Sequence, residues 1–476
     1  MTDFHLRGTG LEDHSLLNED QVVTKKRHQL TGGTDRPSRR RRRICTSCRC
    51  WIVVALLSAM WLAFFGLWLY YSYFAIPSSG KPGAGEVGHN TEAMLVVLPE
   101  SLADETGAYC LDGSPPSYYF RNASSQEHDT SWLVFLEGGG WCYNATHCAQ
   151  KSDTSYGSSR MLNASKEFNG VLSANFTVNP EFYDWNVAVI NYCDGASFSG
   201  NRDLPFEVGN KTIYFRGIRV LDAVITHLLS AGMAQADQIL LSGASAGGLS
   251  VFLHADHVKE LIPEEVSFKA MADAGFFLDE KNISNEDMWR NMMKGVYELQ
   301  EVQGSLDEDC LLAKGTEKWE CFFPEYAYPY INTPIFIINS ALDYWTQLHI
   351  LNLNCRPGLC DEKAQAFFED HREYFLQRTD QVNRYDKDGM FISTCYAHSH
   401  AYYDVPWMNY KVIGKETRQA FADWYFGRST PARSRYVDCD SSLNCNPSCA
   451  ETWGAEYFNS TVCLVLTTDE CFNLLH

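Results

Sequence analysis

The chain has 476 residues, 45% hydrophobic and 21% charged, enough for one large domain with extensions or for two domains. Residues 1–76 carry 11 Lys and Arg against 6 Asp and Glu, whereas residues 77–476 carry 28 against 53, a net charge of −25. A body this acidic argues against nucleic acid as a partner. Because the sequence also lacks a Walker A or dinucleotide fingerprint, we expect no cofactor.

The first 50 residues form a basic tail, which ends in five consecutive arginines at 39–43 and a further arginine at 49. The next 26 residues, 51–76, are uncharged and long enough to cross a bilayer with some tilt. By the positive-inside rule the tail is cytosolic and the rest of the chain is lumenal or extracellular. A cleaved signal peptide is the alternative, but the long polar lead favours an uncleaved signal anchor. We therefore expect a single-pass type II membrane protein whose membrane contact is residues 51–76.

Residues 77–90, rich in Pro, Gly and Ser, predict a linker to an extracytoplasmic domain at 91–476. Apolar runs that predict buried strands follow at 132–136, 187–190, 238–241, 269–272 and 335–338, with a final strand at 390–393. Helical periodicity marks 216–231 and 247–261 between them. This alternation predicts a doubly wound α/β fold of the α/β-hydrolase type, with a mostly parallel sheet.

Cysteines and sequons support an oxidising, glycosylating compartment, because 14 of the 17 cysteines follow the apolar run. Proximity favours the pairs Cys142–Cys148, Cys310–Cys321 and Cys355–Cys360, although sequence alone does not fix connectivity. The five cysteines from Cys439 onward predict a stapled C-terminal cap, with a zinc site as the alternative. Seven sequons follow the run and none precedes it; their acceptors are Asn122, Asn144, Asn163, Asn175, Asn210, Asn282 and Asn459.

The strongest chemical signal is Gly-Ala-Ser-Ala-Gly at 243–247, between a predicted strand and a predicted helix. That setting is typical of a nucleophile elbow, which exposes the hydroxyl of Ser245 on a tight turn. A serine nucleophile needs a base and an orienting acid, which in this fold follow it in the order acid, then histidine. Asp273 and Asp343 follow the next two strands. The acid usually follows the second, so we assign Asp343 and interpret Asp273 as structural.

Several histidines follow Asp343. His349 is too close to it in sequence, and His371 lies in a charged helix. His398 and His400 both follow the final predicted strand, where the base belongs, and spacing does not choose between them. His254, Asp256 and His257 lie on the helix after the elbow without further ligands nearby, so we expect no metal site.

The oxyanion hole requires backbone N–H groups, one of them from Ala246, the residue after the nucleophile. A second N–H should come from a glycine-rich loop after an earlier strand, and residues 138–140 supply that loop. The alternative for these glycines is a plain connecting loop.

Together these residues resemble the pectin acetylesterase family, which includes the Notum carboxylesterases. The resemblance runs from about residue 94 to 449. It rests on ordered motifs: Phe-Leu-Glu-Gly-Gly-Gly-Trp-Cys at 135–142, Asn-Tyr-Cys-Asp-Gly at 191–195, Ser-Gly-Ala-Ser-Ala-Gly-Gly at 242–248, Ala-Asp-Ala-Gly at 272–275, Cys-Phe-Phe-Pro at 321–324, Ile-Ile-Asn-Ser-Ala-Leu-Asp at 337–343 and Cys-Tyr-Ala-His at 395–398. The Gly-Gly-Gly-Trp-Cys form looks like the plant-type acetylesterases.

The resemblance implies a serine ester hydrolase with Ser245, Asp343 and His398 as its triad. It places the base at His398 and the oxyanion donors at Gly139, Gly140 and Ala246. The implied reaction is removal of acetyl groups from a polysaccharide such as pectin. The alternatives are a Notum-like esterase that removes a fatty acyl group from a protein, and a non-catalytic receptor or scaffold. Family members usually carry a cleavable signal, and the anchor expected here departs from that pattern.

Overall fold

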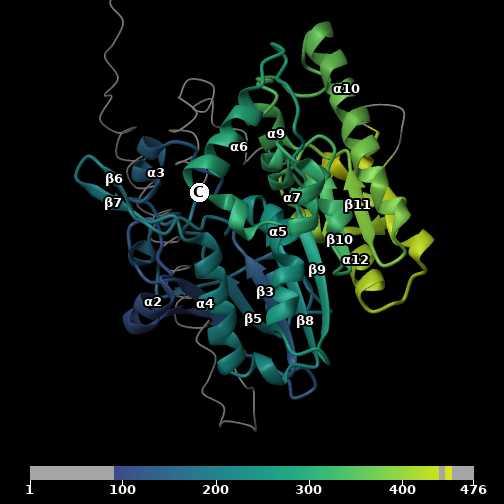
Figure 1. The fold of residues 1–476 in the computed structure, drawn as a ribbon. Helices are drawn as coiled ribbons and strands as arrows, with labels where there is room; N and C mark the ends of the chain where they lie inside the picture. The colour runs from purple at the N-terminus through teal and green to yellow at the C-terminus, as the bar shows by residue number, and fades with distance from the viewer. Residues whose placement is uncertain (1–90, 439–444, 453–476) are drawn as a thin grey trace, which may run out of the picture. The chain divides into compact units, whose positions relative to one another are not determined.

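The computed structural model describes residues 91–438 and 445–452, which belong to one compact unit (Figure 1). A ten-stranded sheet runs through it in the order β14-β11-β10-β9-β8-β3-β5-β2-β1-β4. Every neighbouring pair from β14 to β5 is parallel, and β2, β1 and β4 are added antiparallel at one edge. The strands are β1 Ala93–Val97, β2 Ser117–Arg121, β3 Ser131–Leu136, β4 Ser165–Lys166, β5 Asn186–Ile190, β8 Gln238–Ala244, β9 Ser267–Asp273, β10 Ile335–Ser340, β11 Gly389–Ser393 and β14 Arg435–Val437.

Both faces of the sheet are covered, because alternate side chains of each central strand enter two different cores. On β3, Trp132, Val134 and Leu136 enter one core, whereas Leu133 and Phe135 enter the other. The same alternation on β5, β8, β10 and β11 explains why these strands are continuous apolar runs in the sequence. The mostly parallel α/β fold expected from the sequence is therefore confirmed.

The helices divide between the two faces. The first core receives α4 Gly217–Ser230, α5 Ala246–Leu261, α6 Met288–Leu299 and α10 Glu362–Thr379, and Figure 1 shows α4 and α5 in front of the sheet. The second receives α11 Asp404–Asn409 and α12 Thr417–Tyr425. Shorter elements connect them: α2 Glu100–Thr106, α3 Ala145–Lys151, α7 Glu308–Lys314, α8 Pro324–Ala327, α9 Tyr344–His349, and the small hairpins β6 Phe206–Val208 with β7 Lys211–Ile213 and β12 Lys411–Val412 with β13 Lys415–Glu416.

Five disulfides join cysteines within the described residues. Three are the local pairs expected from proximity, Cys142–Cys148, Cys310–Cys321 and Cys355–Cys360. Two others span 83 and 54 residues, Cys110–Cys193 and Cys395–Cys449. Proximity in sequence could not identify these, because the fold brings their strands and loops together. Cys449 of the predicted cap is thus bound to the loop after β11, while most of that cap lies outside the described residues.

The sequons differ in exposure. Asn282 needs correction as an acceptor: it is 2% exposed, and its amide nitrogen donates to Glu286 Oε2 at 2.8 Å. Its amide oxygen accepts from the N–H groups of Ser284 and Glu286, so this side chain caps a turn rather than facing solvent. Asn459 lies outside the described residues. The other acceptors are exposed: Asn122, Asn144, Asn163, Asn175 and Asn210.

Among residues 91–438 and 445–452, no helix combines the length and the apolar character that a membrane span requires. The basic tail at 1–50, the expected span at 51–76 and the linker at 77–90 lie outside these ranges.

Candidate active site

Ser245 lies on the turn between β8 and α5, with φ 57° and ψ −124°. This left-handed backbone is strained for a residue with a side chain, and such strain is typical of a nucleophile elbow. The turn is tight because its two glycines lie against backbone oxygens, where a side chain would not fit. A Cβ on Gly247 would lie 2.0 Å from Leu136 O, and one on Gly243 would lie 2.3 Å from Gly247 O. The Gly-x-Ser-x-Gly pattern is therefore a packing requirement of this turn.

Asp343 and His398 meet at the carboxyl ends of β10 and β11. Asp343 Oδ2 is 2.7 Å from His398 Nδ1, and Oδ1 accepts from the N–H groups of Trp345 and Thr346 at the start of α9. The two side chains are 3% and 12% exposed. His398 Nε2 is buried and has no partner within the described residues. An Nδ1–H bound to the carboxylate leaves a lone pair on Nε2, the arrangement a general base requires.

Asp273, at the end of β9, connects the serine turn to the histidine loop. Its backbone oxygen accepts from Ser245 N at 2.9 Å, and its carboxylate accepts from the N–H groups of His400 and Ala401. Burial raises the pKa of Asp273 to about 7, although these N–H donors oppose the increase. All hydrogen bonds of this carboxylate go to backbone, which is the geometry of a structural group.

The remaining histidines are placed elsewhere. His400 is fully buried, its Nε2 is 2.7 Å from Ser393 Oγ, and burial lowers its pKa to about 4. His371 pairs with Glu280 at 2.6 Å, and His349 packs on the ring of Trp345. His476 lies outside the described residues.

On α5, the residues weighed as metal ligands have other partners. His254 Nε2 is 2.8 Å from Ser199 Oγ, and His257 Nε2 is 2.6 Å from Asp222. Asp256 accepts from two backbone N–H groups in the turn before β10. Within the part of the chain that the structure describes, no group of three or more His, Cys, Asp or Glu could hold a metal ion.

The glycine-rich loop after β3 lies against the serine turn. A Cβ on Gly138 would be 2.8 Å from Ser245 Cβ and 3.3 Å from Ala246 N. Gly140 has φ +65°, and a Cβ on Gly139 would lie 2.5 Å from the ring of Tyr192. Across the described ranges, the N–H groups of Gly139 and Gly140 have no protein acceptor. The loop therefore holds unused donors beside the first N–H of α5, as an oxyanion hole requires.

The carbonyl groups of this loop are bound by residues that the sequence did not single out. Lys151 Nζ, at the end of α3, donates to Gly139 O, and Tyr192 OH donates to Gly140 O at 2.6 Å. Gln300 donates to Cys142 O at 3.0 Å. Tyr192 belongs to the Asn-Tyr-Cys-Asp-Gly motif and Lys151 follows the second cysteine of the loop disulfide, but neither residue type signals this role by itself.

Four aromatic side chains pack beside the histidine: Trp141 from the glycine loop, Phe277, Trp289 of α6 and Trp345 of α9. Every pair among them is in contact, with ring centroids 5.0 to 6.0 Å apart. The ring of Trp345 lies 6.0 Å from that of His398. We call these four rings the aromatic cluster. It links Trp141 of the glycine loop to Trp345, which packs against His398.

Comparison with known proteins identifies relatives that match the whole domain. The Pectinacetylesterase family matches residues 90–450. Pectin acetylesterase 5 of Arabidopsis thaliana is 37% identical over 364 residues, covering 73% of this chain and 83% of that protein. The palmitoleoyl-protein carboxylesterase NOTUM of Homo sapiens is 27% identical, covering 72% and 71%.

Among solved structures, that of the Wnt deacylase Notum from Drosophila has the same fold. Its TM-score is 0.66 at 24% sequence identity, and the match covers 75% of this chain and 99% of the other. The family match at residues 90–450 spans the serine turn, the glycine loop and the Asp343–His398 pair. The chain belongs to the pectinacetylesterase family.

Proposed function

We propose that this protein is a serine esterase that removes acetyl groups from a polysaccharide. The proposal is supported by a strained Ser245, by the Asp343–His398 pair and by the glycine loop packed against the serine turn, all of which follow the carboxyl ends of the parallel strands. The pectin acetylesterases among its relatives are 33–37% identical to the chain, whereas the Notum carboxylesterases are 27–28% identical.

In the proposed mechanism His398 Nε2 takes the proton of Ser245 Oγ as that oxygen attacks the ester carbonyl. Asp343 orients the imidazole and stabilises its protonated form. The proton then passes from His398 to the ester oxygen of the sugar as the bond between that oxygen and the acyl carbon breaks; the sugar leaves as an alcohol, and an acetyl-serine remains. Water attacks this acyl-enzyme, again with His398 as base, and acetate is released.

The oxyanion of both tetrahedral intermediates binds to the N–H groups of Gly139, Gly140 and Ala246. Loss of one such donor lowers the rate by roughly 100- to 1000-fold in a comparable site. No cofactor enters this scheme.

The aromatic cluster favours a short acyl group. A fatty acyl chain needs a long apolar cavity, and each buried methylene contributes about 0.8 kcal/mol to binding. Here four large rings contact one another pairwise beside the histidine, so a long chain would have to separate them. An acetyl group, one methyl beyond the carbonyl carbon, requires no such separation.

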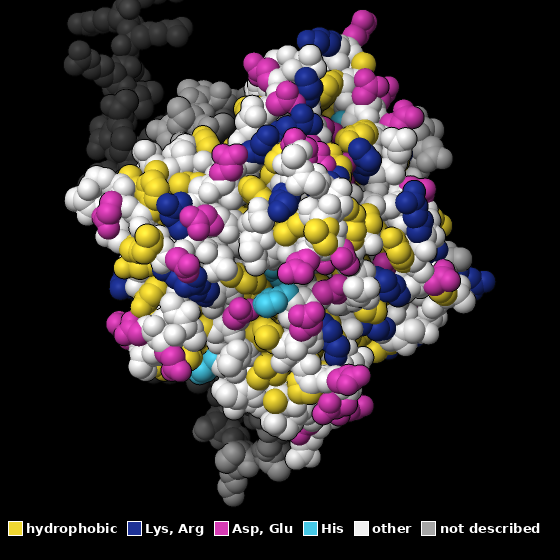
Figure 2. Space-filling model, in the orientation of Figure 1, with side chains coloured by type: hydrophobic (Ala, Val, Ile, Leu, Met, Phe, Trp, Pro, Cys, Tyr) yellow, Lys and Arg dark blue, Asp and Glu magenta, His cyan; other side chains and the backbone are white. Residues whose placement is uncertain are grey.

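The charge of the domain constrains the polysaccharide. Residues 77–476 carry a net charge of −25, and Figure 2 shows acidic and basic side chains interspersed over the visible face rather than a continuous basic band. Bare polygalacturonate would be repelled by such a surface at low salt. Acetylated neutral glycans or heavily esterified pectin fit the charge better.

The test is a series of p-nitrophenyl esters from two to sixteen carbons, with acetate release from acetylated pectin and xylan measured in parallel. We expect the largest kcat/KM at two to four carbons, and none of this activity in Ser245→Ala. A maximum at eight carbons or more would instead support removal of a fatty acyl group from a protein. Failure of a fluorophosphonate probe to label Ser245 would favour the non-catalytic receptor or scaffold.

We also propose that the enzyme is a type II membrane protein with its catalytic domain outside the cytosol. Five exposed sequons and five disulfides support an oxidising, glycosylating compartment. Glycosidase-sensitive protein that resists carbonate extraction is the expected result. A glycosylated but fully extractable protein that begins after residue 76 would show that the apolar segment is cleaved.

A further inference from the structure

We propose that Lys151 is a positioning residue that aims and polarises the Gly140 N–H of the oxyanion hole by binding the carbonyl of Gly139. The inference rests on the proposed function, because it assumes that this N–H stabilises an oxyanion at Ser245. Lys151 does not touch the substrate in this scheme and acts only through the peptide group between Gly139 and Gly140.

The geometry follows from the planarity of that peptide. In a trans peptide the C=O and the next N–H point in opposite directions, so a group that holds Gly139 O also fixes the direction of Gly140 N–H. Lys151 Nζ donates to this oxygen. Tyr192 OH holds the next carbonyl, Gly140 O, at 2.6 Å and itself accepts from Ser197 N at 2.9 Å. The two donors lock consecutive peptides of a loop whose glycines otherwise allow rotation.

The positive charge of Lys151 polarises the same peptide group whose orientation its hydrogen bond fixes. A hydrogen bond from an ammonium group is roughly twice as strong as a neutral one, and it draws electron density toward the carbonyl oxygen. The opposite end of the same peptide, the Gly140 N–H, becomes a better donor. Preorganised donors of this kind stabilise developing negative charge without reorganising during the reaction.

The surroundings leave the ammonium little else to bind. It lies 5.3 Å from the ring centroid of Tyr156 and 5.9 Å from that of Tyr192. The charge of Asp194 acts on it and opposes the loss of its proton. Among the described residues Gly139 O is its one hydrogen-bond acceptor. Removing this partly buried ammonium from water costs free energy, and its one hydrogen bond to the glycine loop offsets part of that cost.

Burial also makes the charge sensitive to pH. It lowers the pKa of Lys151 to about 8, while Asp194 opposes the decrease. Burial raises the pKa of Asp194 to about 7, and it raises those of Tyr192 and Tyr156, so both phenols stay neutral between pH 6 and 9. Above about pH 8 the amine therefore loses its proton, and the polarisation of the peptide weakens.

A second lysine provides a matched control. Lys269 on β9 also donates to a backbone carbonyl, Tyr425 O at 2.6 Å, and lies 5.1 and 5.3 Å from two aromatic rings. Burial lowers its pKa as well. Its carbonyl partner is at the end of α12, so removing this ammonium tests the effect of a lost, partly buried cation without changing the glycine loop.

The experiment compares Lys151→Met, Lys151→Gln, Lys151→Arg and Lys269→Met in the full chain, with p-nitrophenyl acetate from pH 6 to 9.5. A fluorophosphonate titration of Ser245 corrects every rate for the folded fraction. We expect Lys151→Met and Lys151→Gln to lower kcat by about 10- to 100-fold, less than loss of a whole donor, with little change in KM. We expect kcat of the wild type to decline above about pH 8, and this decline should be absent in both variants.

Lys151→Arg should recover most of kcat and move the decline beyond the tested range, since a guanidinium stays protonated. Lys269→Met should keep the wild-type profile. The inference is overturned if Lys151→Met or Lys151→Gln retains kcat within twofold per titrated site, or keeps the decline near pH 8. A wild type that is neither labelled nor active would overturn the proposed function itself, and the inference with it.

Discussion

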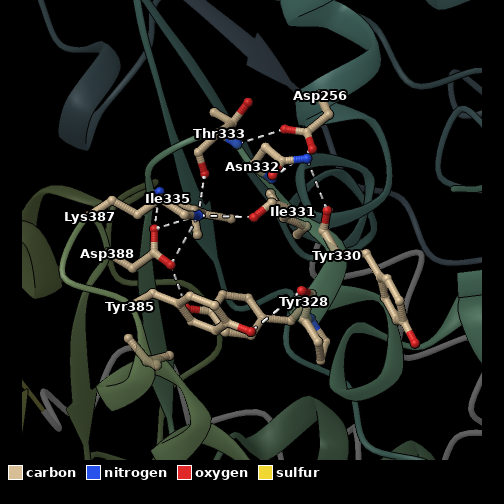
Figure 3. Close-up of polar contacts among 12 residues, drawn as sticks. Asp256, Tyr328, Tyr330, Ile331, Asn332, Thr333, Ile335, Tyr385, Lys387 and Asp388 are labelled. Carbon is tan, nitrogen blue, oxygen red and sulfur yellow. Dashed lines mark hydrogen bonds and ion pairs between the residues drawn. The ribbon is translucent and has the colours of Figure 1, made fainter. Parts of the chain in front are cut away.

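Two groups of buried polar atoms at opposite ends of the parallel strands differ in their hydrogen bonding. At the carboxyl ends, Ser245 is held in a left-handed conformation, and His398 Nε2 and Asp194 Oδ1 are buried without a partner among the described residues. At the amino ends of β10 and β11, the polar groups around Asp388 are all hydrogen-bonded (Figure 3). Both sets are buried, so burial alone does not distinguish a catalytic group from a structural one.

Figure 3 shows the hydrogen bonds and ion pairs around Asp388. Asp388 accepts from Ile335 N at 2.9 Å and from Tyr328 OH at 2.7 Å, and Lys387 Nζ is 3.3 Å from both of its oxygens. The same ammonium donates to the carbonyl groups of Ile331 and Thr333. This network fixes where β10 and β11 begin, because the Asp388 carboxylate and the Lys387 ammonium are both bound by neighbouring groups.

The difference indicates what each end does. A buried polar atom without a hydrogen-bond partner lowers the stability of the folded protein. Such atoms are retained at sites where a substrate or an intermediate supplies the missing partner. The carboxyl ends keep such atoms beside a strained serine. Around Asp388, at the amino ends of β10 and β11, the carboxylate and the ammonium of Lys387 are bound by neighbouring groups, which is the pattern of a structural network.

The largest expected effect is at the carboxyl ends. His398→Ala should lower kcat/KM for p-nitrophenyl acetate by at least about 1000-fold, because no other group near Ser245 can take its proton. The variant also loses the bond from His398 Nδ1 to Asp343 and the ring contact with Trp345, so its melting temperature should fall and its rate is compared per folded molecule. His400→Gln is the control, and its folded fraction should remain active. An inactive His400 variant beside an active His398 variant would reverse the assignment of the base.

Asp388→Ala tests the other end of the comparison. It should lower the free energy of unfolding by about 3–5 kcal/mol, because Lys387 and Tyr328 lose a buried partner. The rate per titrated active site should be unchanged. Urea denaturation and fluorophosphonate titration measure the two quantities separately. Loss of activity in molecules that remain folded would mean that the amino ends also control the site.

Much of the fold was predictable from the sequence because the central strands are buried on both faces. Continuous apolar runs locate β3, β5, β8, β9, β10 and β11 to within three residues. The antiparallel strands β1, β2 and β4 have mixed apolar and polar residues, and the sequence did not predict them. Their pairing depends on tertiary contacts, such as β1 with both β2 and β4, that no local pattern encodes.

The candidate site likewise contains some residues that the sequence predicts and others that it does not. Ser245 and Asp343 follow from strand ends and motif order, and spacing alone left His398 and His400 as alternatives that the family resemblance separated. The structure adds a physical distinction, since His400 is bound to Ser393 and fully buried. Lys151 and Tyr192 could not be predicted, because their role depends on which carbonyl oxygens they reach.

His254 sharpens the comparison, because it is buried near the site and yet structural. Its Nε2 is bound to Ser199, and burial lowers its pKa to about 3. The unfolded chain, with an ordinary histidine pKa of about 6.5, binds the proton first. The stability due to neutral His254 is therefore complete above pH 6.5 and is lost as the pH falls toward 3.

The measurement is the free energy of unfolding at pH 7 and pH 4.5, for the wild type and for His254→Gln. The variant should lose about 2–3 kcal/mol less than the wild type between these values. The difference between the two proteins isolates His254 from Asp194 and Asp273, whose raised pKa values act in the opposite direction. Equal losses in both proteins would show that His254 is not kept neutral by burial.

The smallest expected effect concerns the aromatic cluster, which belongs to the carboxyl ends but makes no polar contact with the pair. Trp289 is 1% exposed and contacts Trp141, Phe277 and Trp345 without touching His398. Trp289→Ala should open apolar space next to the acyl group, and kcat/KM for the hexanoyl ester should rise by about tenfold relative to acetyl, or about 1.4 kcal/mol.

Trp407→Ala removes an equally buried ring from the opposite core and should leave the ratio unchanged. Both variants lose stability, so the ratio of the two esters, which does not depend on the folded fraction, is the quantity to compare. If Trp289→Ala leaves that ratio at its wild-type value, then the acyl group does not lie against the cluster, and something other than these rings selects acetyl.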